Sequence, residues 1–229
     1  MIDKRYDSAR EALKDVFDGA SIMISGFGDA GMPHELVDAL VDQGATDLTV
    51  ISNNAGGGEI GIAALMKANR VRKVVCSFPR MAQPHHFEAR YRAGDVELEL
   101  VPQGNLACRI QAAGAGLGAV YTPTGYGTLL AEGKETREID GRMYVLEYPI
   151  KADFALIKAL TADRWGNLLY RKAGRNFGPI MAMAATTTIA QVSHFAELGE
   201  IDPETVITPG IFVQRVVKLQ PAVDAASAA

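Results

Sequence analysis

The sequence predicts an α/β protein with an open, mainly parallel, twisted sheet that is flanked by helices, followed by a β-rich second half. Short apolar runs alternate with helical patterns at spacings of about 25 residues through the first half of the chain. This alternation is typical of right-handed crossovers between parallel strands. The second half lacks it and contains a hairpin signal and several β-branched runs instead.

Length, composition and charge limit the classes of protein to which the chain can belong. Its 229 residues fit one large domain, predicted over residues 1–218, and a small polar tail at 219–229 that we expect to be disordered. Hydrophobic residues at 48% and charged residues at 22% are typical of a soluble globular protein, which we expect to be cytoplasmic from its cysteines. The net charge of −4 argues against nucleic acid or a membrane as partner. Cys76 and Cys108 fit a reducing compartment.

The first half is predicted to begin with an amphipathic helix at residues 7–17, because its apolar residues fall on one side. Each later strand is a short apolar run, and each later helix follows a break that contains glycine, proline or amide residues. The predicted strands are residues 22–24, 48–51, 71–78 and 96–101. The helices that follow them are predicted at residues 33–41, 60–67, 84–93 and 106–113.

The second half is predicted to open with a loop at residues 121–128, which is too rich in glycine and proline for a regular element. Residues 136–139 and 142–146 flank an Asp-Gly pair, and this pattern predicts a β-hairpin. Residues 181–185 fit either a helix or a buried strand. The remaining apolar or β-rich runs predict strands at residues 153–160, 168–171, 186–192 and 211–217.

Three loops rich in glycine, amide or hydroxyl residues follow predicted strands, at residues 25–31, 52–58 and 102–105. Parallel sheets bind ligands beyond the carboxyl ends of their strands, so these loops are the candidate site. The first loop, SGFGDAG, precedes a helix whose N-terminal N–H groups suit phosphate or another anion. His34 near that loop is either a residue that assists an anionic ligand or an exposed residue of the first helical turn.

The first loop also has the spacing G-x-G-x-x-G of dinucleotide-binding folds. That fingerprint needs an acidic residue at the end of the second strand, where this chain has Ser52-Asn53-Asn54. A dinucleotide site is therefore the weakest interpretation. Two others remain open: a structural turn, or a loop that binds another phosphate-bearing or acyl ligand.

The chain contains no recognisable set of catalytic residues. A G-x-S-x-G nucleophile elbow and a P-loop are both missing from the sequence. Glu59 is either a nucleophile or base or, more simply, a carboxylate that favours a helix N-terminus. The adjacency of His85 and His86 is poor geometry for one ion, so no metal site is predicted. Either the chain is a binding module, or its reactive group comes from another chain.

Five motifs, in order along the chain, resemble the A subunits of the family I 3-oxoacid CoA-transferases. They are SGFGDAGMP from Ser25, SNNAG from Ser52, VPQG from Val101, YTPTGYGT from Tyr121 and RKAGRNF from Arg171. The similarity extends to about Lys218. Four stretches resemble most closely the members that act on 3-oxoadipate, namely SNNAGGGEIGIAAL, VRKVVCSFPR, EGKETREIDGRMYVLE and TPGIFVQRVV.

The resemblance implies a Rossmann-related fold and an enzyme made of A and B chains. It also implies that two A–B pairs assemble into an A2B2 enzyme. It implies transfer of CoA from succinyl-CoA to 3-oxoadipate, with acetoacetate or another short 3-oxoacid as the alternative acceptor. No cofactor is implied beyond the CoA thioester, which is a substrate. In this family a glutamate of the B chain forms the glutamyl-CoA thioester, so Glu59 is not implied as the nucleophile. A non-catalytic acyl-CoA-binding module is the alternative outside the enzymes.

The resemblance also assigns roles to residues of this chain. Gln103 matches the glutamine whose amide helps to form the oxyanion hole, and Asn53 matches a second polar contact in the active site. A neutral amide stabilises charge on a thioester oxygen without adding a titrating group, an effect of typically ~3 kcal/mol. The segment that matches the CoA contact comprises Ser25, Gly26, Phe27, Gly28, Asp29, Ala30 and Gly31.

Overall fold

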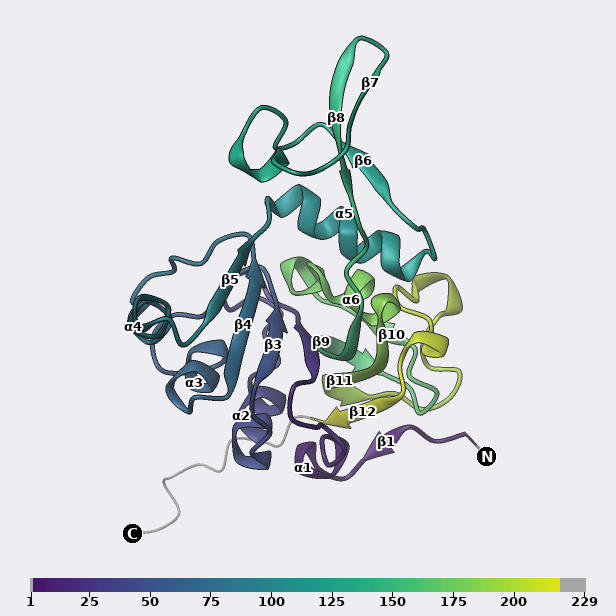
Figure 1. Cartoon of the computed structure of the whole chain (residues 1–229). Helices are drawn as coiled ribbons and strands as arrows, with labels where there is room; N and C mark the ends of the chain where they lie inside the picture. The colour runs from purple at the N-terminus through teal and green to yellow at the C-terminus, as the bar shows by residue number, and fades with distance from the viewer. Residues whose placement is uncertain (1, 219–229) are drawn as a thin grey trace.

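The computed structural model describes residues 2–218 and contains a nine-stranded sheet (Figure 1). Its strands are β1 Arg5–Tyr6, β2 Ser21–Ile24, β3 Leu48–Ile51, β4 Val71–Cys76, β5 Glu97–Leu100, β9 Ala152–Ala162, β10 Leu168–Leu169, β11 Ala185–Phe195 and β12 Arg215–Lys218. Eight of them lie in the order β1-β12-β11-β9-β2-β3-β4-β5, and every pair in that order is parallel. The ninth strand, β10, pairs antiparallel with β9. The predicted α/β fold with a mainly parallel sheet is confirmed.

Helices cover both faces of this sheet. They are α1 Ala9–Ala12, α2 His34–Gln43, α3 Ile62–Lys67, α4 His85–Ala93, α5 Gln103–Gly114 and α6 Gly178–Ala184. Buried residues of α1 to α4 belong to one hydrophobic cluster, and those of α5 and α6 belong to another. Along β2, Ile22 and Ile24 enter the first cluster and Met23 the second, because successive side chains of a strand point to opposite faces.

The strand order reverses between β2 and β9. From β2 the chain adds β3, β4 and β5 in one direction, whereas β9, β11 and β12 extend in the other. Ile24, the last residue of β2, pairs with Leu156, so β9 continues beyond the end of β2 as far as Ala162. The reversal leaves a crevice at the carboxyl end of β2, which is the usual ligand position in open α/β sheets.

A second, antiparallel sheet projects from the body of the molecule beside α5 (Figure 1). It contains β6 Val120–Thr122, β7 Thr136–Ile139 and β8 Arg142–Glu147 in the order β6-β8-β7. Asp140 and Gly141 connect β7 to β8 with φ values of 51° and 75°. Two positive φ values in succession are typical of a type I′ turn, which confirms the predicted hairpin.

Several predicted boundaries were wrong. The first helix ends at Ala12 instead of residue 17, because the chain then continues in turns and Arg215 Nη1 binds the Ala12 carbonyl oxygen at 2.6 Å. Phe17, expected on its buried side, is 52% exposed. Residues 210–212 form a 3-10 helix after Pro209, so the last strand begins at Arg215 instead of residue 211.

Of the ambiguous stretch at residues 181–185, the first four residues belong to α6 and Ala185 begins β11. Three further 3-10 helices lie at Leu129–Ala131, Lys172–Arg175 and Pro203–Thr205. No helix within residues 2–218 is long and apolar enough to cross a membrane. The tail predicted at 219–229 lies outside the described residues, and the assignment of residues 1–218 to one domain stays a prediction.

Candidate functional site

The loop of residues 25–31, called the glycine loop below, follows β2 and is held at both ends by Asn176. The N–H of Gly26 donates to Asn176 Oδ1 at 3.0 Å, and Asn176 Nδ2 donates to the carbonyl of Ala30 at 2.9 Å. Inside the loop, Ser25 Oγ donates to the carbonyl of Gly31 at 2.7 Å. Sequence patterns predict no role for Asn176, although it lies in the RKAGRNF motif. It joins that motif to the glycine loop.

Gly31 lies where no other residue fits. Its φ of +75° is unfavourable for any residue with a Cβ. A Cβ atom built there would lie 2.4 Å from Asn176 Nδ2 and 2.5 Å from the carbonyl oxygen of Gly174. The third glycine of the loop therefore permits close approach of a distant segment, in addition to the turn itself.

Asn53 and Gln103, which the sequence predicts in two different loops, are in direct contact. Gln103 Nε2 donates to Asn53 Oδ1 at 2.7 Å, and Ser77 Oγ donates to the same oxygen at 2.9 Å. Asn53 is 5% exposed, whereas Gln103 is exposed at the first residue of α5 and is not part of a loop as expected. An amide nitrogen carries two hydrogens. One N–H of Gln103 therefore binds Asn53, and the other has no partner within residues 2–218.

A first cleft of about 380 Å³ lies beside the glycine loop, where the strand order reverses. The glycine loop lines it with Asp29, Ala30 and Gly31. Strands β9 and β11 contribute Lys158, Ala159, Leu160 and Ser193, and the RKAGRNF motif contributes Arg171 and Gly174. The cleft thus lies at the expected ligand position of an open α/β sheet.

A second cleft of about 330 Å³ is lined by the glycine loop and by the loop after β3. His34 and Asn54 both line it. The Nδ1 atom of His34 and the Nδ2 atom of Asn54 are buried and have no hydrogen-bond partner within residues 2–218. The His34 side chain is 30% exposed, so it is not the fully solvated first-turn residue that was one of its two interpretations. Both residues therefore bring an unpartnered polar atom to the lining of this cleft.

The carboxylate of Glu59 contacts the side chains of Lys67 and His86. Lys67 Nζ lies 2.8 Å from one carboxylate oxygen, and His86 Nε2 lies 3.0 Å from the other. These hydrogen bonds lower the pKa of Glu59 to about 2. His85 Nε2 also approaches it, at 3.8 Å. One ligand atom from each of Glu59, His85 and His86 lies within 4.8 Å of the other two. Within residues 2–218, this is the cluster of such side chains whose spacing could hold a metal ion.

The two thiols differ sharply in accessibility. Cys76 is fully buried, and its burial raises the pKa of the thiol to about 12. Cys108 is exposed on α5. A thiol reacts as the thiolate, so Cys76 is unsuited to act as a nucleophile at neutral pH.

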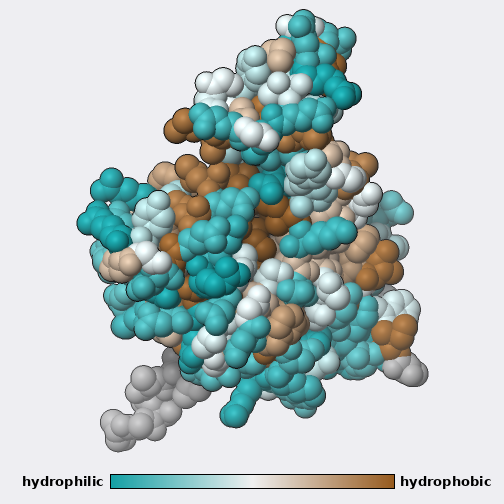
Figure 2. Space-filling model, viewed as in Figure 1, coloured by the Kyte–Doolittle hydropathy of each residue, from teal (hydrophilic) through white to brown (hydrophobic). Residues whose placement is uncertain are grey.

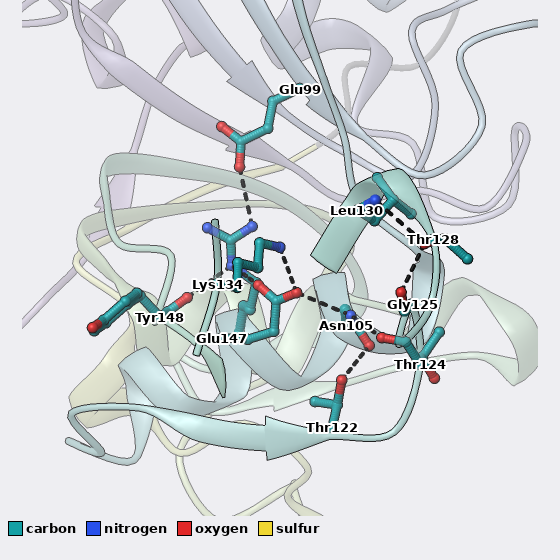
Figure 3. Close-up of polar contacts among 11 residues, drawn as sticks. Glu99, Asn105, Thr122, Thr124, Gly125, Thr128, Leu130, Lys134, Glu147 and Tyr148 are labelled. Atoms are coloured by element: carbon teal, nitrogen blue, oxygen red, sulfur yellow. Dashed lines mark hydrogen bonds and ion pairs between the residues drawn. The ribbon is translucent and has the colours of Figure 1, made fainter. Parts of the chain in front are cut away.

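Polar side chains attach α5, whose first residue is Gln103, to the projecting sheet (Figure 3). The buried carboxylate of Glu147 accepts hydrogen bonds from Lys134 Nζ at 2.7 Å and from Asn105 Nδ2 at 3.2 Å. Arg109 Nε lies 3.8 Å from the same carboxylate, and Arg109 Nη1 donates to Glu99 at 3.0 Å. This network holds α5 against β8 and β5 and so fixes the position of the candidate site.

Comparisons of the sequence with a family model and with known proteins point to the same family. A family model described as coenzyme A transferase matches residues 6–219. The A subunit of 3-oxoadipate CoA-transferase from Pseudomonas putida is 70% identical over 217 residues, which are 95% of this chain and 94% of that protein. Its counterpart in Acinetobacter baylyi is 64% identical over 96% of both chains. The A subunit of succinyl-CoA:3-ketoacid coenzyme A transferase from Xanthomonas campestris pv. campestris is 50% identical, over 93% of this chain and 88% of that protein.

Solved structures show the same fold. Glutaconate coenzyme A-transferase of Acidaminococcus fermentans superposes with a TM-score of 0.82 at 23% identity, over 94% of this chain and 75% of that chain. An acyl-CoA transferase of Escherichia coli O157:H7, solved as a thioester complex with CoA, gives 0.81 at 22% identity. That match covers 96% of this chain but 48% of the longer one. This chain therefore belongs to the coenzyme A transferase family, as an A subunit of the family I type that its motifs resemble.

Proposed function

We propose that this chain is the A subunit of an enzyme that transfers CoA from succinyl-CoA to 3-oxoadipate and releases 3-oxoadipyl-CoA and succinate. The observation that carries the proposal is the 70% and 64% identity, over nearly the whole chain, to two proteins named as A subunits of 3-oxoadipate CoA-transferase. The contact between Asn53 and Gln103 supports it, because a fixed amide donor suits thioester chemistry. The complete enzyme would be a cytoplasmic A2B2 assembly.

Gln103 acts in this proposal through its second amide N–H. Asn53 Oδ1 accepts the first one and so sets the orientation of the side chain. The second N–H donates to the thioester oxygen as negative charge develops there during attack. One donor of this kind typically lowers a barrier by ~3 kcal/mol. Asn53 is then a positioning residue, and its own oxygen is held by Ser77.

The nucleophile in this proposal is a glutamate of the B chain. Its carboxylate attacks the succinyl carbonyl carbon, the C–S bond breaks, and CoA leaves as the thiolate. The thiolate attacks the glutamyl carbonyl of the resulting anhydride, which releases succinate and forms the glutamyl-CoA thioester. Attack by a carboxylate of 3-oxoadipate and return of the thiolate reverse the sequence and regenerate the glutamate. Glu59 of this chain is already engaged by Lys67 and His86, which supports a nucleophile from elsewhere.

The glycine loop contributes contacts to CoA in this proposal. Ser25, Gly26, Phe27, Gly28, Asp29, Ala30 and Gly31 are the proposed contact segment. The two clefts beside this loop, and the free polar atoms of His34 and Asn54, are observations that support it. No cofactor is needed, because the CoA thioester is itself a substrate.

A competition assay tests the reaction and the acceptor together. The chain is co-expressed with a candidate B chain, and succinyl-CoA is supplied with equal concentrations of 3-oxoadipate and acetoacetate. Mass spectrometry of the CoA esters should show mainly 3-oxoadipyl-CoA. Mainly acetoacetyl-CoA would favour the second candidate function, transfer of CoA to acetoacetate. The 50% identity to the A subunit of a succinyl-CoA:3-ketoacid coenzyme A transferase supports that alternative. Tight binding of CoA esters without any exchange would favour a non-catalytic binding module.

The role of Gln103 has its own test. Gln103→Ala should lower kcat by about 100-fold or more in an assembled complex, because the donor acts on the transition state. Gln111→Ala is the matched control, since Gln111 is an exposed glutamine of the same helix. An unchanged kcat for Gln103→Ala in an intact complex would remove Gln103 from the site.

A further inference from the structure

The first cleft carries two cations that lack partners. Lys158 from β9 and Arg171 from the RKAGRNF motif both line it, and neither side chain has an ion pair or hydrogen bond within residues 2–218. By contrast, Lys67, Lys73 and Lys134 each have a carboxylate partner. Two unpaired cations at the reversal of strand order indicate a site for a negatively charged group.

The backbone around Lys158 connects this cation to the glycine loop. The N–H of Lys158 donates to Ser25 Oγ at 3.2 Å, and the same hydroxyl donates to the carbonyl of Gly31. Lys158 lies two residues beyond Leu156, the partner of the last residue of β2. It therefore occupies the part of β9 that extends past β2, where the crevice opens.

The rest of the lining leaves the cleft positively charged. Asp29 is the acidic residue among the lining residues, so two cations face one carboxylate and the net charge is +1. The Asp29 side chain is 92% exposed, and its Oδ1 atom lies 3.9 Å from Nε2 of His34. Asp29 therefore leaves Lys158 and Arg171 free for a ligand. Ser193 adds a neutral hydroxyl to the same cleft.

We propose that Lys158 and Arg171 bind a terminal anionic group of the acyl-CoA substrate in this cleft. This inference rests on the proposed function, and it assigns the chemistry that neither Gln103 nor Asn53 supplies. The group has charged oxygens, and it comes from one of two sources: the free carboxylate of a dicarboxylic acyl chain or a phosphate of CoA. Arginine matches either group with two parallel N–H donors, and lysine adds a point charge.

Binding measurements on the A–B complex test the inference without requiring turnover. The probes are succinate, for the carboxylate, and adenosine 3′,5′-bisphosphate, for the nucleotide end of CoA, and affinity is measured by titration calorimetry. Lys158→Met and Arg171→Met should each weaken one probe about tenfold or more, because each removes a charge-assisted contact. Lys158→Arg should restore much of that affinity. Arg175→Met is the control, because Arg175 lies in the same motif but does not line the cleft.

The outcomes separate the two sources. Loss confined to succinate assigns the cleft to the acyl carboxylate, and loss confined to the bisphosphate assigns it to CoA. Unchanged affinity for both probes in both variants overturns the inference, as does a native complex that binds neither probe. Arg171 is exposed, so its variant should fold even if the Lys158 variant does not. A complex that binds a probe through these residues but transfers no CoA would refute the proposed function and leave the subsite intact.

Discussion

The nine-stranded sheet and the projecting three-stranded sheet are held in place by different interactions. Two hydrophobic clusters cover the faces of the larger sheet, and residues such as Ile22 and Leu156 are fully buried. The three strands of the smaller sheet bury a single apolar side chain, that of Val145. Its connection to α5 depends on the buried carboxylate of Glu147 and its cationic partners.

The difference shows how a sheet too small for a core of its own can still be positioned. A small sheet without a hydrophobic face of its own needs packing against a helix to be stable in water. Hydrophobic residues gather between the projecting sheet and the body on the face seen in Figure 2. Yet Leu129 remains 81% exposed and Tyr148 64% exposed near that sheet. Hydrogen bonds with fixed geometry therefore set its position, whereas apolar burial stabilises the body.

The largest expected effect comes from opening a cavity in the body. Leu156→Ala should lower the free energy of unfolding by about 2–5 kcal/mol, because it removes a fully buried side chain between β2 and β11. Leu129→Ala is the same change at an exposed position and should stay within about 0.5 kcal/mol. Urea unfolding monitored by circular dichroism measures the free energy of unfolding of both variants. Equal losses in the two variants would contradict the comparison.

The next effect concerns the glycine loop, which belongs to the body but is shaped by close contacts. Gly28→Ala should cost about 1–2 kcal/mol, because Gly28 has φ +60° but leaves open space where a Cβ atom would lie. Gly31→Ala should cost about 1–3 kcal/mol more, because the new methyl group would overlap Asn176 and Gly174. Thermal unfolding of the pair isolates the steric part. Equal melting temperatures for the two variants would show that the close approach of Asn176 and Gly174 to Gly31 adds no steric cost.

A smaller and more local effect is expected in the projecting sheet. Glu147→Gln keeps the shape of the side chain but removes the charge shared by Lys134 and Arg109. We expect a loss of about 1–3 kcal/mol in the opening free energy of β7 and β8, measured by amide hydrogen exchange. Glu138→Gln is the control, since Glu138 is exposed on β7 and has no ion-pair partner within residues 2–218. Equal loss of protection in β9 would show that the two sheets open together.

The smallest effect is a pH dependence at the junction of the two sheets. Burial raises the pKa of Glu99, but hydrogen bonds and charges from Lys73 and Arg109 outweigh burial and lower it below the usual 4.5. The folded state then binds the proton less well than the unfolded state. The stabilisation is therefore complete above about pH 4.5 and is lost as the pH falls through the lowered pKa. In urea unfolding at a series of pH values, the native chain should lose its stability advantage over Glu99→Gln in that range, and a constant difference would contradict this assignment.

Local patterns were sufficient for much of the fold. The strands at residues 48–51 and 136–139 agree with the structure at both ends, and the Asp140-Gly141 turn was predictable because its residues tolerate positive φ. Boundaries failed where distant residues intervene. Arg215 binds the carbonyl at the end of α1 from a position 203 residues away, and no local pattern between residues 7 and 17 reports that contact.

Taken alone, the sequence determined the fold class, the hairpin and the family, because periodicity, turn chemistry and motifs are properties of neighbouring residues. Only the tertiary structure decided which side chains meet. Gln103 reaches Asn53 across 50 positions, and Asn176 reaches Gly26 across 150. Lys158 and Arg171 share a cleft because the strand order reverses between β2 and β9. Strand order depends on how the whole chain packs, and a spacing between residues does not report it.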